Sequence, residues 1–66
     1  MIDDSLRQRI KKAESWSVEY RGTPYDDARQ VDGRWYYRDL LNRKYREFAS
    51  QHDVVPLSKN PPETSN

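Results

Sequence analysis

The chain has 66 residues, of which 33% are hydrophobic and 35% are charged, and its formal net charge at pH 7 is +1. This length allows one domain with a small core. The sequence has no cysteine and no long apolar run, which argues against a disulfide framework, a thiolate zinc site, a membrane span and a signal peptide. We therefore expect a cytoplasmic protein with no membrane partner.

The first segment has apolar side chains at the spacing of one helix face, namely at Ile2, Leu6, Ile10, Ala13, Trp16 and Tyr20. This pattern predicts a helix over 3–20. The acidic and hydroxyl side chains at 3–5 can cap its start, and Gly22 can end it. Residues 15–20 also alternate between polar and apolar, which is typical of a half-buried strand. A strand is therefore the alternative for this second half.

The middle segment predicts a short helix over 24–31. Thr23 can cap it, and Pro24 stands at the first helical position, where a missing N–H is tolerated. Tyr25, Ala28 and Val31 then mark one face. The alternative is a β-hairpin in which Asp32-Gly33 forms a two-residue turn.

The third segment predicts a helix over 34–51. If residues 34–50 are helical, one face carries an apolar stripe formed by Tyr37, Leu41, Tyr45 and Phe48. This stripe accounts for three of the five aromatic side chains in the segment. Trp35 and Tyr36 fall on the other side of the same helix, among arginines.

The last segment loses this periodicity. Residues 52–57 can form a short extended arm, and residues 58–66 have a polar, proline-containing composition that predicts a disordered tail. We therefore expect one mainly α, three-helix domain over 1–57, followed by the tail. The alternative fold is α+β, with a short hairpin and strands at 15–20 and 33–37.

The residue types that carry catalysis or bind cofactors are sparse. His52 is the single histidine, and the glycines at 22 and 33 do not form a phosphate-binding loop. Asp26 and Asp27 suit the first turn of a helix better than a calcium loop, because the ligand spacing of such a loop is absent. We therefore expect no enzymatic activity, cofactor, metal ion or small-molecule substrate.

The positive charge is concentrated in residues 34–48, where five basic and two acidic side chains give +3. Tryptophan, tyrosine and arginine are also the residue types enriched at binding hot spots. We therefore expect a small binding or regulatory protein that uses one helix face for a protein partner or for self-association. The predicted site consists of Trp35, Tyr36, Arg38, Asn42, Arg43 and Arg46.

Nucleic acid is the alternative partner. Arginine and asparagine side chains can read base edges, and an exposed aromatic ring can stack on an unpaired base. The acidic residues of 17–33 and the low net charge count against this alternative.

Overall fold

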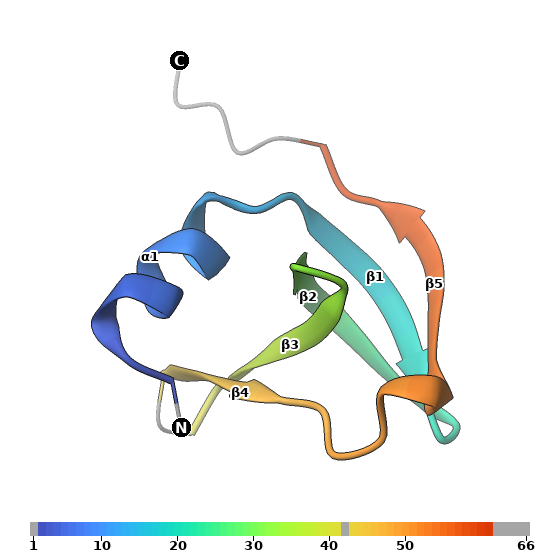
Figure 1. Ribbon diagram of the computed structural model, residues 1–66. Coiled ribbons are helices and arrows are strands. Elements are labelled where there is room, and N and C mark those ends of the chain that lie inside the picture. The colour runs from blue at the N-terminus through green and yellow to red at the C-terminus, as the bar shows by residue number, and fades with distance from the viewer. Residues whose placement is uncertain (1, 42, 62–66) are drawn as a thin grey trace.

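The protein is mainly an antiparallel β-sheet of five strands with one short α-helix, in a computed structural model that describes residues 2–41 and 43–61. The predicted mainly α, three-helix fold is therefore wrong, as is the expectation of a helical partner-binding face. The alternative α+β fold is closer, because it contained the strand at 15–20. The sheet order is β4-β3-β2-β1-β5, and Figure 1 shows how strongly the sheet curves.

Helix α1 spans Asp4–Lys12 and begins where the sequence predicts. The Asp3 carboxylate accepts a hydrogen bond of 2.8 Å from the Leu6 backbone N–H, as an N-cap residue does. The helix ends at Lys12 rather than at Tyr20, because Ala13 is already extended and the next residues join the sheet. Within the described residues, α1 is too short to cross a membrane, and no other helix could do so.

Strands β1 (Ser15–Tyr20), β2 (Thr23–Val31) and β3 (Arg34–Asp39) form two consecutive hairpins. Each turn has two residues with positive φ, Arg21 (50°) with Gly22 (83°) and Asp32 (54°) with Gly33 (81°). This geometry is the type I′ turn, whose twist matches that of paired strands. The predicted helix over 24–31 is therefore wrong, and the alternative Asp32-Gly33 turn is confirmed.

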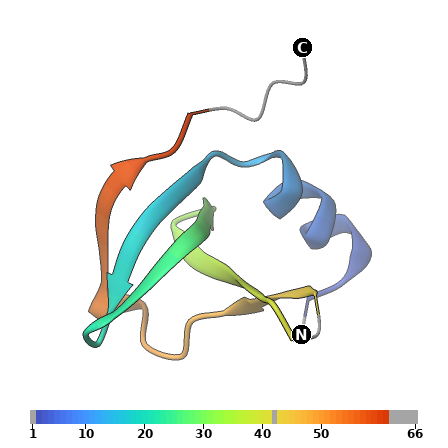
Figure 2. The same ribbon diagram turned by 180° about the vertical axis from the view of Figure 1, so that it is seen from behind.

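The predicted helix over 34–51 is also wrong. It is replaced by β3, by β4 (Lys44–Glu47) and by the start of a 3₁₀ turn at Gln51–Asp53. Strand β5 (Val54–Lys59) then returns to pair with β1. The expected start of the tail at residue 58 therefore falls inside a strand, and residues 62–66 lie outside the described part of the chain. Seen from behind, α1 and β5 lie on opposite sides of the molecule (Figure 2).

Two apolar clusters form the core, and they share no buried residue. The larger cluster contains Val18, Ala28, Trp35, Phe48 and Val54. The smaller cluster joins α1 to the sheet through Ile10, Val31 and Tyr36. Trp35 and Tyr36 are neighbours in β3 and point to opposite faces of the strand, so β3 is covered on both sides. A strand that is covered on both faces loses the alternating pattern by which a strand is recognised in a sequence.

A bulge in β2 decides which side chains face the larger cluster. Trp16 pairs with Ala28, but Val18 pairs with Tyr25, so two residues of β2 stand opposite one residue of β1. Tyr25 and Ala28 are three residues apart and would face opposite sides of a regular strand. The bulge places both against the larger cluster, and this displacement creates the site described next.

Candidate functional site

The two predicted aromatic site residues are buried. Trp35 is 8% exposed and Tyr36 is 5% exposed. Trp35 packs edge-on against Trp16, with ring centroids 6.1 Å apart, and Tyr36 packs against α1. The expectation that both rings are exposed on one face is therefore wrong, because strand geometry directs neighbours to opposite faces.

The polar members of the predicted site have different surroundings. Arg46 lies on β4, and its Nε donates to the Asp39 carboxylate at 2.8 Å. Arg38 at the end of β3 and Arg43 before β4 are exposed. Asn42 lies outside the described residues. The structure thus separates the buried rings from the exposed arginines, which remain near one another at the β3–β4 connection.

A groove of about 470 Å³ opens beside this connection. It is called the aromatic groove here, and it is lined by Pro24, Tyr25, Asp26, Asp27, Tyr37, Arg38, Asp39, Leu40 and Leu41. The rings of Tyr25 and Tyr37 lie 5.1 Å apart, and each contacts the buried ring of Phe48. The two tyrosines are therefore held by the core on one side and face the groove on the other.

The polar groups of these tyrosines are available to a ligand. Tyr20, in the same aromatic cluster, uses its hydroxyl to accept a hydrogen bond from the Ser50 N–H at 3.1 Å. Within the described residues, the hydroxyls of Tyr25 and Tyr37 and the carboxylate of Asp26 make no hydrogen bond or ion pair. An apolar floor with a few unsatisfied polar groups is typical of a binding surface.

The tip of the β3–β4 hairpin carries two strongly exposed leucines. Leu40 is 82% exposed and Leu41 is 94% exposed. The Asp39 carboxylate accepts a hydrogen bond of 3.0 Å from the Leu41 N–H while it also pairs with Arg46. These contacts fix the backbone of the turn without burying either leucine. We call residues 38–41 and 43–44 the hairpin tip.

The sequence pattern assigned Leu41 to the core, and it did not identify Leu40 or Tyr25 as site residues. The helix-like spacing of Tyr37, Leu41 and Tyr45 favoured a helix over the turn between β3 and β4. One signal in the sequence pointed to it, because the leucines stand between Asp39 and Asn42, two residue types that favour turns. The bulge that positions Tyr25 depends on pairing with β1 and leaves no comparable local signal.

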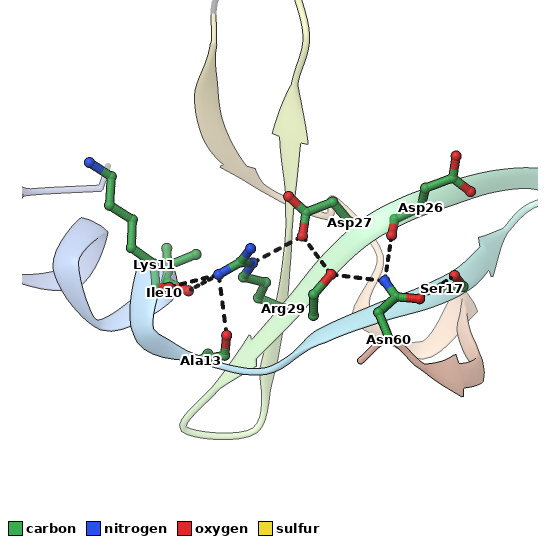
Figure 3. Close-up of polar contacts among 9 residues, drawn as sticks. Ile10, Lys11, Ala13, Ser17, Asp26, Asp27, Arg29 and Asn60 are labelled. Carbon is green, nitrogen blue, oxygen red and sulfur yellow. Dashed lines mark hydrogen bonds and ion pairs between the residues drawn. The ribbon is translucent and has the colours of Figure 1, made fainter. Parts of the chain in front are cut away.

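A second hollow, of about 780 Å³, surrounds the end of α1 and is organised by Arg29. The Arg29 Nη1 atom donates to the carbonyl oxygens of Ile10, Lys11 and Ala13, at 3.5, 2.7 and 3.2 Å. Its Nε donates to the Asp27 carboxylate at 3.0 Å. Figure 3 shows this guanidinium group between the helix end and β2. These contacts satisfy carbonyls that a helix end leaves unpaired, which gives Arg29 a structural role.

The same network ties down the chain after β5. Asn60 Nδ2 donates to Ser15 Oγ and to the Asp26 carbonyl, and Asn60 Oδ1 accepts from Ser17 Oγ (Figure 3). Ser15 Oγ in turn donates to Asp27 at 2.7 Å. The polar groups of this hollow are therefore used mainly to connect α1, β1, β2 and the end of β5.

One ion pair joins the first hairpin turn to the 3₁₀ turn. Arg21 Nε donates to the Asp53 carboxylate at 2.9 Å. This hydrogen bond lowers the pKa of Asp53 below its ordinary value, with a second contribution from Ser50, and it raises the pKa of Arg21. Both groups are exposed and neither lines the aromatic groove, so we assign the pair to structure.

Within residues 2–41 and 43–61, no group of three or more His, Asp or Glu side chains could hold a metal ion. No protein-family model matches the chain, and no curated protein or solved structure is significantly similar to it. The aromatic groove and the hairpin tip are therefore the features from which we infer a function.

Proposed function

We propose that the protein is a non-enzymatic binding protein that holds a protein partner in the aromatic groove and on the hairpin tip. The observation that carries this proposal is the exposure of Leu40 and Leu41 beside Tyr25 and Tyr37. Adjoining apolar side chains that remain exposed in a small domain are typical of interaction surfaces.

The groove also has the rigidity that a binding surface needs. Tyr25 and Tyr37 lose little freedom when a partner binds, because their rings already pack on Phe48. Ordering flexible side chains weakens association, and a preformed surface avoids that loss. Tyrosine is also among the residue types that dominate binding energy at interfaces.

Strand β5 presents the other exposed apolar side chains, Val55 and Leu57, but it is less suited to a partner. Pro56 stands between them and has no N–H to donate to an added strand. Proline on an edge strand prevents continuous pairing with another chain. Leu57 is 59% exposed, and it therefore provides a matched control for the proposed site.

The experiment places a photoreactive amino acid at Leu41 or, as the control, at Leu57, in the full chain expressed in its native host. We expect a discrete crosslinked protein from position 41 and not from position 57. Mass spectrometry identifies the partner, and the Leu40→Ser variant should weaken its binding to the purified chain. Identical adducts from both positions, or none from position 41, would contradict the proposal. Crosslinking of a second copy would instead indicate self-association.

Nucleic acid is a second candidate, favoured by the exposed Arg38, Arg43 and Lys44 of the hairpin tip. Tryptophan fluorescence is poorly suited to test it, since Trp35 is buried against Trp16. Anisotropy of labelled DNA and RNA at low and high salt is the better measurement. Affinity that falls steeply with salt, as phosphate contacts require, would favour nucleic acid over a protein partner.

A further inference from the structure

We propose that the partner presents an acidic segment with apolar side chains, and that its carboxylates lie against Arg38, Arg43 and Lys44 of the hairpin tip. This inference rests on the proposed function and names the chemistry of the partner. The apolar side chains would lie on Leu40, Leu41 and the two tyrosines of the aromatic groove.

The ion pairs of the protein are unevenly distributed among its basic side chains. Seven of the twelve lysine and arginine side chains pair with a carboxylate, in seven separate pairs. The other five form no ion pair within the described residues, and three of these five are Arg38, Arg43 and Lys44. The unpaired positive charge is therefore concentrated where the exposed leucines are.

The hairpin tip does not neutralise its own positive charge. Its acidic residue, Asp39, already binds Arg46 and the Leu41 N–H. Glu47 on the adjoining strand forms an ion pair with Arg34. The carboxylates of the tip and of β4 thus have partners, and Arg38, Arg43 and Lys44 are exposed to solvent without an ion pair in the described part of the chain. Arginine binds carboxylates with two parallel hydrogen bonds, so it suits an acidic partner.

The backbone of Arg43 also sets this residue apart, because its φ is 55°. Residues other than glycine, asparagine and aspartate rarely adopt this left-handed conformation. Among residues 2–41 and 43–61, the other non-glycine residues with positive φ are Arg21 and Asp32, and each forms an ion pair. Arg43 has no such contact within the described residues. Arg43 therefore holds a positive φ without an ion pair in this part of the chain, and its charge is left for an external partner.

The orientation of the segment follows from Asp26. This carboxylate lines the aromatic groove on β2, across from the hairpin tip, and it has no cationic partner within the described residues. It would repel an acidic side chain placed over β2. The acidic groups of the partner should therefore lie over the tip, with apolar or basic groups over Asp26.

The test selects binders to the full chain from a library of random displayed peptides. We expect enriched peptides that combine Asp or Glu with large apolar residues. Replacing Arg38, Arg43 and Lys44 together by alanine should weaken their binding about tenfold, as three exposed charge pairs would. Asp26→Asn should strengthen it about twofold by removing the repulsion. The control variant, Lys11→Ala with Lys12→Ala, removes two cations elsewhere that form no ion pair in the described residues. It should leave the binding of the selected peptides unchanged.

A separate variant distinguishes binding from folding. Arg43→Gly relieves the positive φ, so the melting temperature should be unchanged or higher while binding of the acidic peptides weakens. Equal weakening by the control variant, or enriched peptides that are neutral or basic, would overturn the acidic partner. If such peptides still required Leu40 and Leu41, the proposed function would survive. Enrichment that is independent of both leucines would contradict the proposed function as well.

An anionic membrane carries the same negative charge as an acidic protein segment, so lipid vesicles test it as an alternative partner. Vesicles that contain phosphatidylserine should not sediment the chain. Co-sedimentation that is lost in the Leu40→Ser, Leu41→Ser variant would overturn the protein partner in favour of a lipid surface.

Discussion

Arg29 shows how much one side chain can depend on its distant neighbours. Its side chain is 14% exposed, and its guanidinium group contacts three carbonyls at the end of α1 and the carboxylate of Asp27. Its position in the sequence, next to Ala28 and Gln30, gives no indication of this role. The sheet brings Arg29 to the helix end, so the contact is a result of tertiary structure.

We expect Arg29→Met to lower the free energy of unfolding by about 2–3 kcal/mol, because it leaves the carbonyls at the helix end and the Asp27 carboxylate without their charged donor. Arg29→Lys should have an intermediate effect, since one ammonium group cannot reproduce the planar fork. Urea denaturation measures both changes. Lys12→Met, at the exposed end of the same helix, is the control, and an equal loss in this variant would contradict the capping role.

The residues of strand β3 that precede Tyr36 are not paired with β4, so their backbone groups need other hydrogen-bond partners. The ladder between the two strands covers Tyr36 to Asp39. Next to it, the Gln51 side chain accepts a hydrogen bond from the Trp35 N–H and donates to the carbonyls of Trp35 and Phe48. The amide group of Gln51 therefore pairs with the Trp35 backbone, whose carbonyl also accepts from the Phe48 N–H, and it holds the 3₁₀ turn against the sheet.

Gln51→Glu tests this substitute pairing without a change of size. A carboxylate cannot donate to the two carbonyls and would lie against them, so unfolding should become easier by about 2 kcal/mol. The loss should shrink at acid pH, where a protonated glutamate can donate again. His52→Ala in the same turn is the control, and its effect should stay within about 0.5 kcal/mol. Equal effects of the two changes in urea denaturation would show that the amide contributes little.

At the scale of the whole molecule, the core and the candidate site share one aromatic cluster. Phe48 is buried, and the tyrosines around it extend from the core to the aromatic groove. The hairpin tip extends from this cluster into solvent. The aromatic floor of the site therefore contributes to stability, whereas the tip is free to be changed.

This division predicts a large loss of stability for a variant in the core and almost none for a variant in the hairpin tip. Trp35→Ala should lower the free energy of unfolding by about 3 kcal/mol or more, since it empties the larger core cluster. The Leu40→Ser, Leu41→Ser double variant should change it by less than about 0.5 kcal/mol. Urea or thermal denaturation measures the free energy of unfolding of both variants. A large loss in the leucine variant would mean that the leucines are buried in solution, and the proposed binding surface would then have to be abandoned.

The parts of the fold that could be predicted from the sequence are those governed by neighbouring residues. Asp3 caps the helix because its carboxylate reaches an N–H three residues ahead. Gly33 after Asp32 allows a two-residue turn because both positions need positive φ. The candidate site could be predicted only in part. Arg38 and Arg43 are exposed as expected, whereas Trp35 and Tyr36 are buried.

By itself, the sequence determined the start of α1, the local chemistry of a tight turn at Asp32-Gly33 and the concentration of positive charge in residues 34–48. Only the tertiary structure decided that Trp35 and Tyr36 lie in separate clusters, that Tyr25 faces the aromatic groove and that Leu41 is exposed. The physical reason is the separation along the sequence between the residues that interact. Caps and turns depend on residues a few positions apart, whereas strand pairing, the bulge in β2 and the cover on both faces of β3 depend on segments that meet only when the chain has folded.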